Sequence, residues 1–167
     1  MLNKKFGFAS LTIILVIIIL GVVGYVFYQN SQTSDQTADW KTYTDSAQIF
    51  SFKYPEKLST VYIKTQEWPP SVKIATGNFS CAGRETLTTP VFCVVAQEEP
   101  AAGTFYTSYA YTTTLDDKLV TFNFILRQPN DCGPIPDVDR QKCLDEERSF
   151  SVDNLVQQIF ATFKFIN

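Results

Sequence analysis

The sequence predicts an α+β protein, in which an N-terminal transmembrane helix is followed by a mostly antiparallel sheet packed by a C-terminal helix. Residues 8–27 form an apolar run without a charged side chain. Several stretches within residues 48–127 alternate between apolar and polar side chains, as half-buried strands do. From Val152 to Phe163 the apolar residues recur instead at helical spacing. A chain of 167 residues leaves room for one domain after the apolar run.

The apolar run has the length and polarity of a membrane-spanning helix. At about 1.5 Å of rise per residue, residues 8–27 cover about 30 Å, the thickness of the hydrocarbon core of a bilayer. Lys4 and Lys5 precede the run, and no Lys or Arg follows it before Lys41. The positive-inside rule therefore leaves residues 1–7 in the cytoplasm and exports the rest. We expect a single-pass protein of the cell membrane, with the lipid bilayer as the partner of residues 8–27.

A type IV prepilin leader is the main alternative to a plain anchor. Residues 4–8 (KKFGF) resemble the basic leader and the Gly–Phe junction that a prepilin peptidase cuts. A pilin-like (pseudopilin) subunit would be processed after Gly7 and would continue its first helix through residues 28–39. Thr12 stands where pilins carry a Glu, so a plain anchor is favoured. A cleaved signal peptide is disfavoured, because its apolar region is usually roughly 7–15 residues long and an A-x-A site follows it.

Residues 28–39 have the composition of a flexible linker, since they are polar and rich in Ser, Thr and Gln. Residues 40–167 then form the extracytoplasmic domain. A domain of that length buries roughly two thirds of the surface of its unfolded chain, which is sufficient for a single core.

The strands of this domain are predicted from alternating apolar and polar residues. They are expected at residues 48–54, 59–64, 72–75, 91–97, 104–113 and 118–127. In the first of them Phe50 and Phe52 share one face, and Pro55 ends the strand because it cannot donate to a ladder. Residues 114–117 (TLDD) predict a hairpin turn, so the sheet is expected to be largely antiparallel.

The C-terminal helix is predicted from an apolar stripe. The stripe consists of Val152, Leu155, Val156, Ile159, Phe160 and Phe163. Ser151 is a natural N-cap, and Asp153 places a negative charge in the first turn, where the helix dipole favours it. A second helix, with a weaker pattern, is predicted at residues 40–47.

The four cysteines all lie on the exported side of the apolar run, where an even number of them implies two disulfides. Three pairings are open. We favour Cys81–Cys93 and Cys132–Cys143, because each pair encloses a short segment rich in turn residues. A zinc site made of the four cysteines is disfavoured, since their spacing is far longer than that of C-x2-C pairs.

Composition excludes several classes of function. Histidine is absent, so Ser–His–Asp and Cys–His sites cannot form. The net charge of −3 argues against a nucleic-acid partner, which needs a basic surface. The sequence contains no nucleophile elbow, Gly-rich phosphate loop or paired acid–base signature. We therefore expect a protein that is not an enzyme, without a catalytic residue, a cofactor or a metal.

Two segments are candidates for contact with a protein partner in the cell envelope. Trp68 precedes two prolines, which suggests an exposed aromatic side chain on a rigid loop. Asp137 and Asp139 belong to the acidic segment 131–147. Calcium binding is the alternative for this segment, but its spacing differs from that of an EF-hand. A solvated loop tied by a disulfide is favoured, and in pilins such a loop is an interaction surface.

The two ends of the predicted domain resemble a known family. Residues 40–44 (WKTYT) and 50–55 (FSFKYP) are similar to the opening of PsbP-like domains, and residues 159–165 (IFATFKF) are similar to the closing helix of that family. The resemblance implies an antiparallel sheet flanked by helices in an α/β/α sandwich, an arrangement that membrane-anchored bacterial proteins carry. The metal-binding histidines of plant members have no counterpart here, so the resemblance does not imply metal binding.

Overall fold

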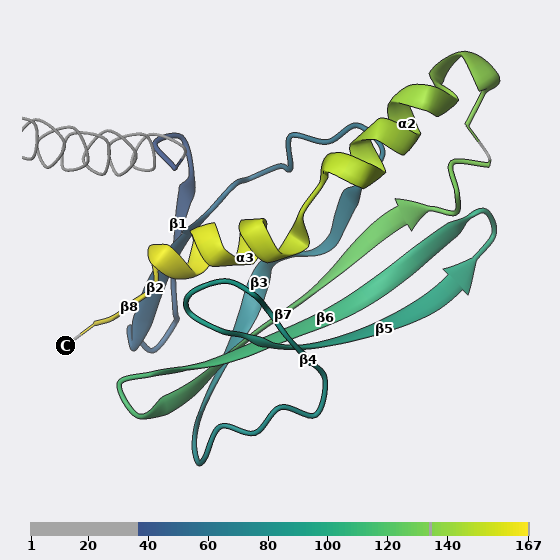
Figure 1. Ribbon diagram of the computed structural model, residues 1–167. Coiled ribbons are helices and arrows are strands. Elements are labelled where there is room, and N and C mark those ends of the chain that lie inside the picture. The colour runs from purple at the N-terminus through teal and green to yellow at the C-terminus, as the bar shows by residue number, and fades with distance from the viewer. Residues whose placement is uncertain (1–36, 134, 167) are drawn as a thin grey trace, which may run out of the picture. The chain divides into compact units, whose positions relative to one another are not determined.

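The computed structural model describes residues 37–133 and 135–166 (Figure 1). The predicted cytoplasmic tail, the anchor predicted at residues 8–27 and most of the predicted linker lie outside the described residues. Among the residues that are described, no helix has the length and apolar character needed to cross a membrane. Residues 37–39, the end of the predicted linker, form a turn.

The described part of the chain folds into a series of strands, then two helices, then a short closing strand. The elements are β1 (Lys41–Thr44), β2 (Phe50–Tyr54), β3 (Lys64–Thr76), β4 (Arg84–Glu85), β5 (Cys93–Ala101), β6 (Thr104–Leu115), β7 (Lys118–Pro129), α2 (Asp137–Ser149), α3 (Val152–Ala161) and β8 (Lys164–Phe165). The strands form two antiparallel sheets, of order β1-β2-β8 and β3-β7-β6-β5-β4. The α+β class predicted from the sequence is confirmed.

Tight turns join β5 to β6 and β6 to β7, so these three strands form a meander. Asp116 and Asp117, between β6 and β7, both have positive φ, as a type I′ hairpin turn requires. This confirms the hairpin turn predicted at residues 114–117. In the turn between β5 and β6, Gly103 has a φ of 72°, a left-handed conformation that glycine adopts without steric cost.

A cluster of aromatic side chains fills the core between the two sheets and α3. The rings of Phe52 in β2 and Phe122 in β7 are fully buried, with centroids 5.7 Å apart in an edge-to-face arrangement. Phe160 of α3 and Phe163 just after it lie 6.1 and 5.8 Å from Phe122. In Figure 1, α3 runs across β2 and the larger sheet, which these ring contacts explain. Burying such a side chain stabilises the fold by about 1.5–3 kcal/mol.

The C-terminal helix and the main strands are confirmed. Helix α3 begins after Ser151, whose hydroxyl accepts a hydrogen bond from the backbone N–H of Asn154 at 3.2 Å. Val156 and Ile159, from the predicted apolar stripe, are buried. The strands predicted at residues 48–54, 91–97, 104–113 and 118–127 correspond to β2, β5, β6 and β7.

Two predictions at the start of the domain are wrong, and a third, the strand at residues 72–75, is confirmed but too short. Residues 40–47 are not a helix but β1 and a turn, because β1 pairs with β2 and the ring of Tyr43 packs 5.1 Å from that of Phe52. Residues 59–63 are irregular rather than a strand. The strand predicted at residues 72–75 is only the second half of β3, which begins at Lys64.

The prediction of a loop over residues 131–147 is also wrong, because α2 begins at Asp137. Pro136 occupies the position before the helix, and Asp137 and Asp139 lie in the first turn, where the helix dipole favours negative charge. Cys143 is the one buried residue of α2. The helix therefore has no apolar stripe, and hydrophobic periodicity could not reveal it.

Both predicted disulfides are confirmed. Cys81 and Cys93 are joined with their Cα atoms 5.2 Å apart, so the loop before β4 is tied to the start of β5. Cys132 and Cys143 are joined with their Cα atoms 6.0 Å apart, which ties the segment after β7 to α2. Both sulfurs of the second bridge belong to fully buried residues.

Candidate functional site

Trp68, predicted as an exposed contact residue, lies within β3 rather than on a loop. Its indole N–H donates to the backbone oxygen of Pro55 at 2.7 Å. The ring makes edge-to-face contacts with Tyr54 and Phe124, at centroid distances of 6.3 and 5.9 Å. Trp68 is therefore half-buried at the margin of the core, and the expectation of an exposed aromatic side chain on a loop is wrong.

Asp137 and Asp139 lie together in the first turn of α2. Asp137 is exposed, and a carboxylate oxygen of Asp139 forms an ion pair with the ammonium of Lys142 at 2.9 Å. Trp68 and these aspartates share no hydrogen-bonding or aromatic partner in the described part of the chain. Their role in contacting a partner stays a prediction.

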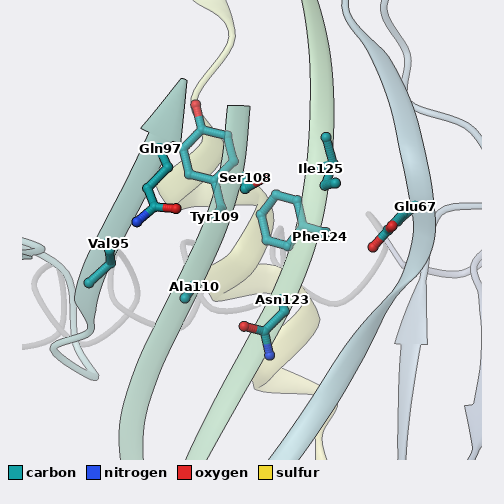
Figure 2. Close-up of a pocket in the computed structure, with 9 residues that line it drawn as sticks. All are labelled: Glu67, Val95, Gln97, Ser108, Tyr109, Ala110, Asn123, Phe124 and Ile125. Atoms are coloured by element: carbon teal, nitrogen blue, oxygen red, sulfur yellow. The ribbon is translucent and has the colours of Figure 1, made fainter. Parts of the chain in front are cut away.

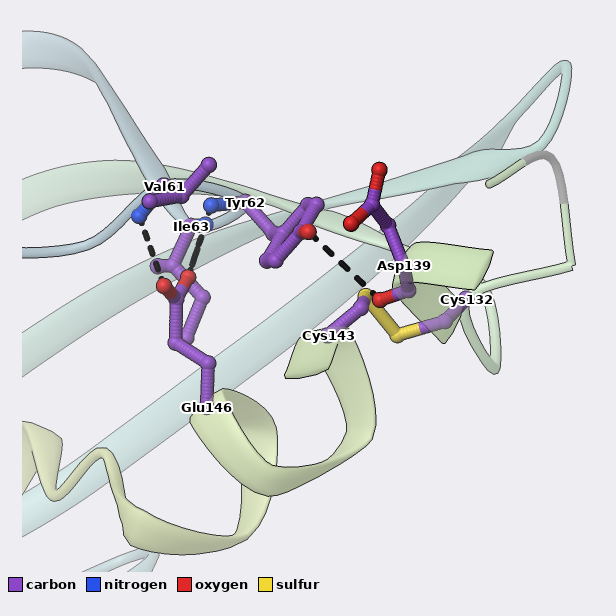
Figure 3. The surroundings of a disulfide bond; sticks show 7 residues. All are labelled: Val61, Tyr62, Ile63, Cys132, Asp139, Cys143 and Glu146. Atoms are coloured by element: carbon purple, nitrogen blue, oxygen red, sulfur yellow. Dashed lines mark hydrogen bonds between the residues drawn. A yellow bond between two sulfur atoms is a disulfide. The ribbon is translucent and has the colours of Figure 1, made fainter. Parts of the chain in front are cut away.

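Glu146 fixes the irregular segment before β3 (Figure 3). Its carboxylate accepts hydrogen bonds from three successive backbone N–H groups, those of Val61 at 2.6 Å, Tyr62 at 2.7 Å and Ile63 at 2.9 Å. Burial raises the pKa of Glu146, but these hydrogen bonds and the charge of Lys64 outweigh burial, so the pKa lies below its ordinary value. Glu146 therefore stays ionised and holds residues 61–63 against α2.

The disulfide lies one helical turn from Glu146 on the same helix (Figure 3). Cys143 is bonded to Cys132, and the hydroxyl of Tyr62 points to the backbone oxygen of Asp139 at 3.5 Å. A covalent bond and a charge-assisted hydrogen-bond cluster thus attach α2 to two segments that are far apart in the sequence. Tyr62 is placed beside the start of α2 as a result.

A pocket with a volume of about 260 Å³ lies beside this attachment, and we call it the Lys64–Arg127 pocket. Four separate segments contribute to it: the residues before β3, the β5–β6 turn, the end of β7 and the stretch before α2. The lining residues are Val61, Tyr62, Lys64, Ala102, Gly103, Thr104, Arg127, Pro129 and Ile135. Two of them are basic and none is acidic.

The two basic side chains are brought together by strand register. Lys64, the first residue of β3, is the cross-strand partner of Arg127 in β7. The ammonium of Lys64 donates to the backbone oxygen of Thr60 at 3.2 Å, which leaves two of its three N–H groups for other acceptors. Arg127 is exposed and forms no ion pair with any described residue. The pocket is therefore a concentration of positive charge on an acidic protein.

A second hollow, of about 320 Å³, crosses the outer face of the larger sheet (Figure 2). Val95, Ala110 and Asn123 lie opposite one another on β5, β6 and β7. The amide nitrogen of Asn123 is buried and has no hydrogen-bond partner among the described residues. The residues that line it are mostly neutral, and Glu67 is the one charged residue among them.

Arg84, Tyr111 and Asp153 form a polar cluster with a structural role. The guanidinium of Arg84 makes two hydrogen bonds, of 2.9 and 2.8 Å, to the carboxylate of Asp153, and the Tyr111 hydroxyl donates to the same carboxylate at 2.5 Å. The bond from Arg84 lowers the pKa of Asp153, and burial raises that of Tyr111. Neither group titrates near neutral pH, where a general acid or base is most effective.

One group of residues has the composition of a metal site but not its chemistry. The sulfurs of Cys132 and Cys143 and the carboxylate of Glu147 lie within 4.8 Å of one another. Because the two sulfurs are bonded to each other, neither is the thiolate that binds a metal. Burial, followed by the charges of Asp131 and Glu146, raises the pKa of Glu147.

Sequence reasoning missed Lys64, Arg127 and Glu146. The two basic residues lie at the ends of predicted strands, and only the pairing of β3 with β7 brings them together. Glu146 lies in the acidic segment 131–147, and nothing in the sequence signals that its carboxylate accepts three backbone N–H groups. The chain matches no protein-family model, no curated protein and no solved structure.

Proposed function

We propose that the chain is a membrane-anchored extracytoplasmic binding domain without catalytic activity. Residues 8–27 hold it in the bilayer, residues 28–39 give it reach, and residues 40–167 meet a ligand or a protein of the cell envelope. The observation that carries the proposal is the pair of disulfides, Cys81–Cys93 and Cys132–Cys143. Disulfides persist in oxidising compartments, which agrees with the orientation indicated by the basic N-terminus.

Two acidic groups with lowered pKa values, Glu146 and Asp153, are engaged in holding the fold together. The carboxylate of Glu146 is used by three backbone N–H groups, and that of Asp153 by Arg84 and Tyr111. Both side chains hold elements of the fold together. In contrast, the basic groups of the Lys64–Arg127 pocket are available to a ligand.

We further propose that the domain is a PsbP-like α/β/α sandwich. The segments that resemble this family lie at opposite ends of the domain sequence, yet they are neighbours in the smaller sheet. Residues 40–44 and 50–55 contain β1 and β2, and residues 159–165 end in β8, which pairs with β2. Phe50 lies opposite Phe165 in that pairing. The two segments that resemble the family therefore belong to one structural unit, the sheet of β1, β2 and β8.

The proposed topology is tested with two cysteine variants of the full chain and a membrane-impermeant maleimide. Ser31→Cys places a thiol in the linker, and Asn3→Cys places one in the predicted cytoplasmic tail. In intact spheroplasts the maleimide should label Ser31→Cys, whereas Asn3→Cys should be labelled only after lysis. The opposite pattern would overturn the proposal. The wild-type chain is the control, because its described cysteines are all disulfide-bonded.

The pilin-like alternative depends on the leader-like residues 4–8. It predicts a helix through residues 28–39, but residues 37–39 form a turn and β1 begins at Lys41. Intact mass of the protein from its native membrane distinguishes the two proposals. Loss of residues 1–7 would support a pilin-like subunit, and a chain that is full-length or lacks only Met1 would support a static anchor.

A further inference from the structure

We infer that the Lys64–Arg127 pocket binds a phosphate group. The inference deepens the proposed function, because it names the class of ligand that the exported domain would meet. Arg127 supplies a planar guanidinium that can donate two parallel hydrogen bonds to one oxyanion, and Lys64 supplies a second, mobile point charge. Their positions on paired strands direct both charges to the same hollow.

The charge of the pocket matches a phosphate better than a carboxylate. A phosphate ester carries a charge of about −1.5 to −2 near neutral pH, which two cations balance, whereas a carboxylate needs only one. The acidic residues nearest in the strand register are Glu67, opposite Ile125, and Glu99, two strands away from Arg127. Among the described residues, neither of them forms an ion pair with the cations of the pocket.

One acid near Lys64, Glu146, is already engaged. Glu146 lies near enough for Lys64 to lower its pKa, yet its oxygens accept three backbone N–H groups. The same bonds hold residues 61–63, so the wall of the pocket is fixed before a ligand arrives. Preorganisation of this kind reduces the free-energy cost of ordering on binding.

Size and polarity indicate which part of a ligand enters. A volume of about 260 Å³ is slightly below the roughly 300–1,000 Å³ of sites that enclose whole small molecules, so the pocket accommodates a single compact group. Pro129 and Ile135 add apolar surface beside the two cations. A phosphate attached to an aliphatic group uses both features, and the phosphate comes either from a lipid headgroup or from a soluble phosphate.

Calorimetry on the full chain in dodecyl maltoside micelles, which carry no phosphate, tests the inference, with inorganic phosphate as the first probe and ionic strength held constant. Arg127→Gln and Lys64→Gln should each weaken binding about tenfold or more, the expected effect of losing a hydrogen bond to a charged group. Lys73→Gln is the matched control, because Lys73 is also an exposed residue of β3 but lies outside the pocket. It should change affinity by less than about twofold if only the pocket binds.

A second probe, short-chain phosphatidic acid in monomeric form, distinguishes the two sources of phosphate. Tighter binding of this lipid than of inorganic phosphate would assign the pocket to a lipid headgroup, and equal affinity would assign it to soluble phosphate. The inference is overturned if neither probe binds saturably, if acetate binds more tightly than phosphate, or if Lys73→Gln is as damaging as the pocket variants. Because binding is measured on the chain in detergent micelles, a failure to bind leaves the proposed topology standing, and an inverted topology leaves the binding result standing.

Discussion

Glu146 holds residues 61–63 against α2 through a single carboxylate. It has no sequence neighbour among its three hydrogen-bond donors, which lie more than eighty positions earlier in the chain. Three N–H groups that would otherwise need water are satisfied by one carboxylate. A carboxylate bound in this way contributes more to stability when it is ionised than when it is protonated.

We predict that Glu146→Gln lowers the free energy of unfolding by about 1–2 kcal/mol at pH 7, because hydrogen bonds to a charged acceptor become bonds to a neutral one. Urea unfolding monitored by fluorescence measures the change. Asp145→Asn is the matched control, since Asp145 is exposed and bonds only Gln141 and Arg148 on its own helix. Its effect should stay within about 0.5 kcal/mol.

The comparison of wild type with Glu146→Gln also gives a prediction about pH. The pKa of Glu146 is lower in the folded state than its ordinary value. Its stabilising contribution is therefore complete above the ordinary carboxyl pKa and is lost as the pH falls through the folded value. The difference in unfolding free energy between wild type and Glu146→Gln should shrink between neutral and acid pH. A difference that does not vary with pH would show that the ionised form is not responsible.

At the scale of elements, α2 depends on its attachments more than on its own sequence. The helix has 13 residues and buries only Cys143. Isolated helices of about 12–15 residues are marginally stable in water. The Cys132–Cys143 disulfide and Glu146 attach α2 to the rest of the domain. In α3 an apolar stripe makes this attachment, since Val156 and Ile159 are buried.

We predict that replacing Cys132 and Cys143 by Ser selectively weakens α2. Loss of the disulfide should cost about 2–3 kcal/mol of stability in the chain-entropy model. Hydrogen exchange followed by mass spectrometry should show lower protection across residues 137–149, with α3 much less affected. The matched control replaces Cys81 and Cys93, which should lower protection around β4 instead. Equal loss of protection over the whole domain in both variants would contradict this view of α2.

Whether an element could be predicted depended on how it is stabilised. α3 and β7 bury one regular face, and the apolar side chains of β2 alternate with polar ones along the sequence, so all three carry a periodic signal. α2 is polar on nearly all sides, and β3 contains Pro69 and Pro70 along with shifts of register, so the periodic signal is absent or interrupted. β1 is short and owes its conformation to β2.

The candidate site could not be predicted, because pairing between distant strands creates it. In the sequence, nothing links Lys64 to Arg127, and only the register of β3 with β7 brings them together. A shift of that register by one residue would move one of the two side chains to the other face of the sheet. The disulfides could be predicted, since short loops left few sensible pairings. The burial of Trp68 could not be predicted, because its partners, Tyr54 and Phe124, belong to other strands.

At the scale of the whole domain, the two ends of the sequence meet. β8 pairs with β2, and Phe163, just before β8, is 8% exposed and stacks on Phe50 with centroids 5.4 Å apart. Phe165 contacts Phe163 edge-to-face and lies under the ammonium of Lys118. The smaller sheet therefore closes only when the last strand is in place.

We predict that Phe163→Ala lowers the free energy of unfolding by about 3–5 kcal/mol, because it leaves a cavity among packed rings. Urea unfolding of the full chain in micelles, followed by near-ultraviolet circular dichroism, measures the loss. Ile166→Ala is the control near the same end of the chain, since its side chain is 38% exposed. It should cost less than about 1 kcal/mol. Similar effects of both variants would show that the last residues are not part of the core.

The order of strands in the larger sheet affects how neighbouring copies of the domain would meet. β4 pairs only with Cys93 and Val94, so the rest of β5 has an open edge in the described part of the chain. An open edge can recruit a strand from another molecule, and domains at high local concentration meet often. Glu98 and Glu99 carry like charges along this edge, and Pro100 offers no N–H to an incoming strand. Neighbouring copies would thus repel each other along the open margin of β5, where an incoming strand could otherwise pair.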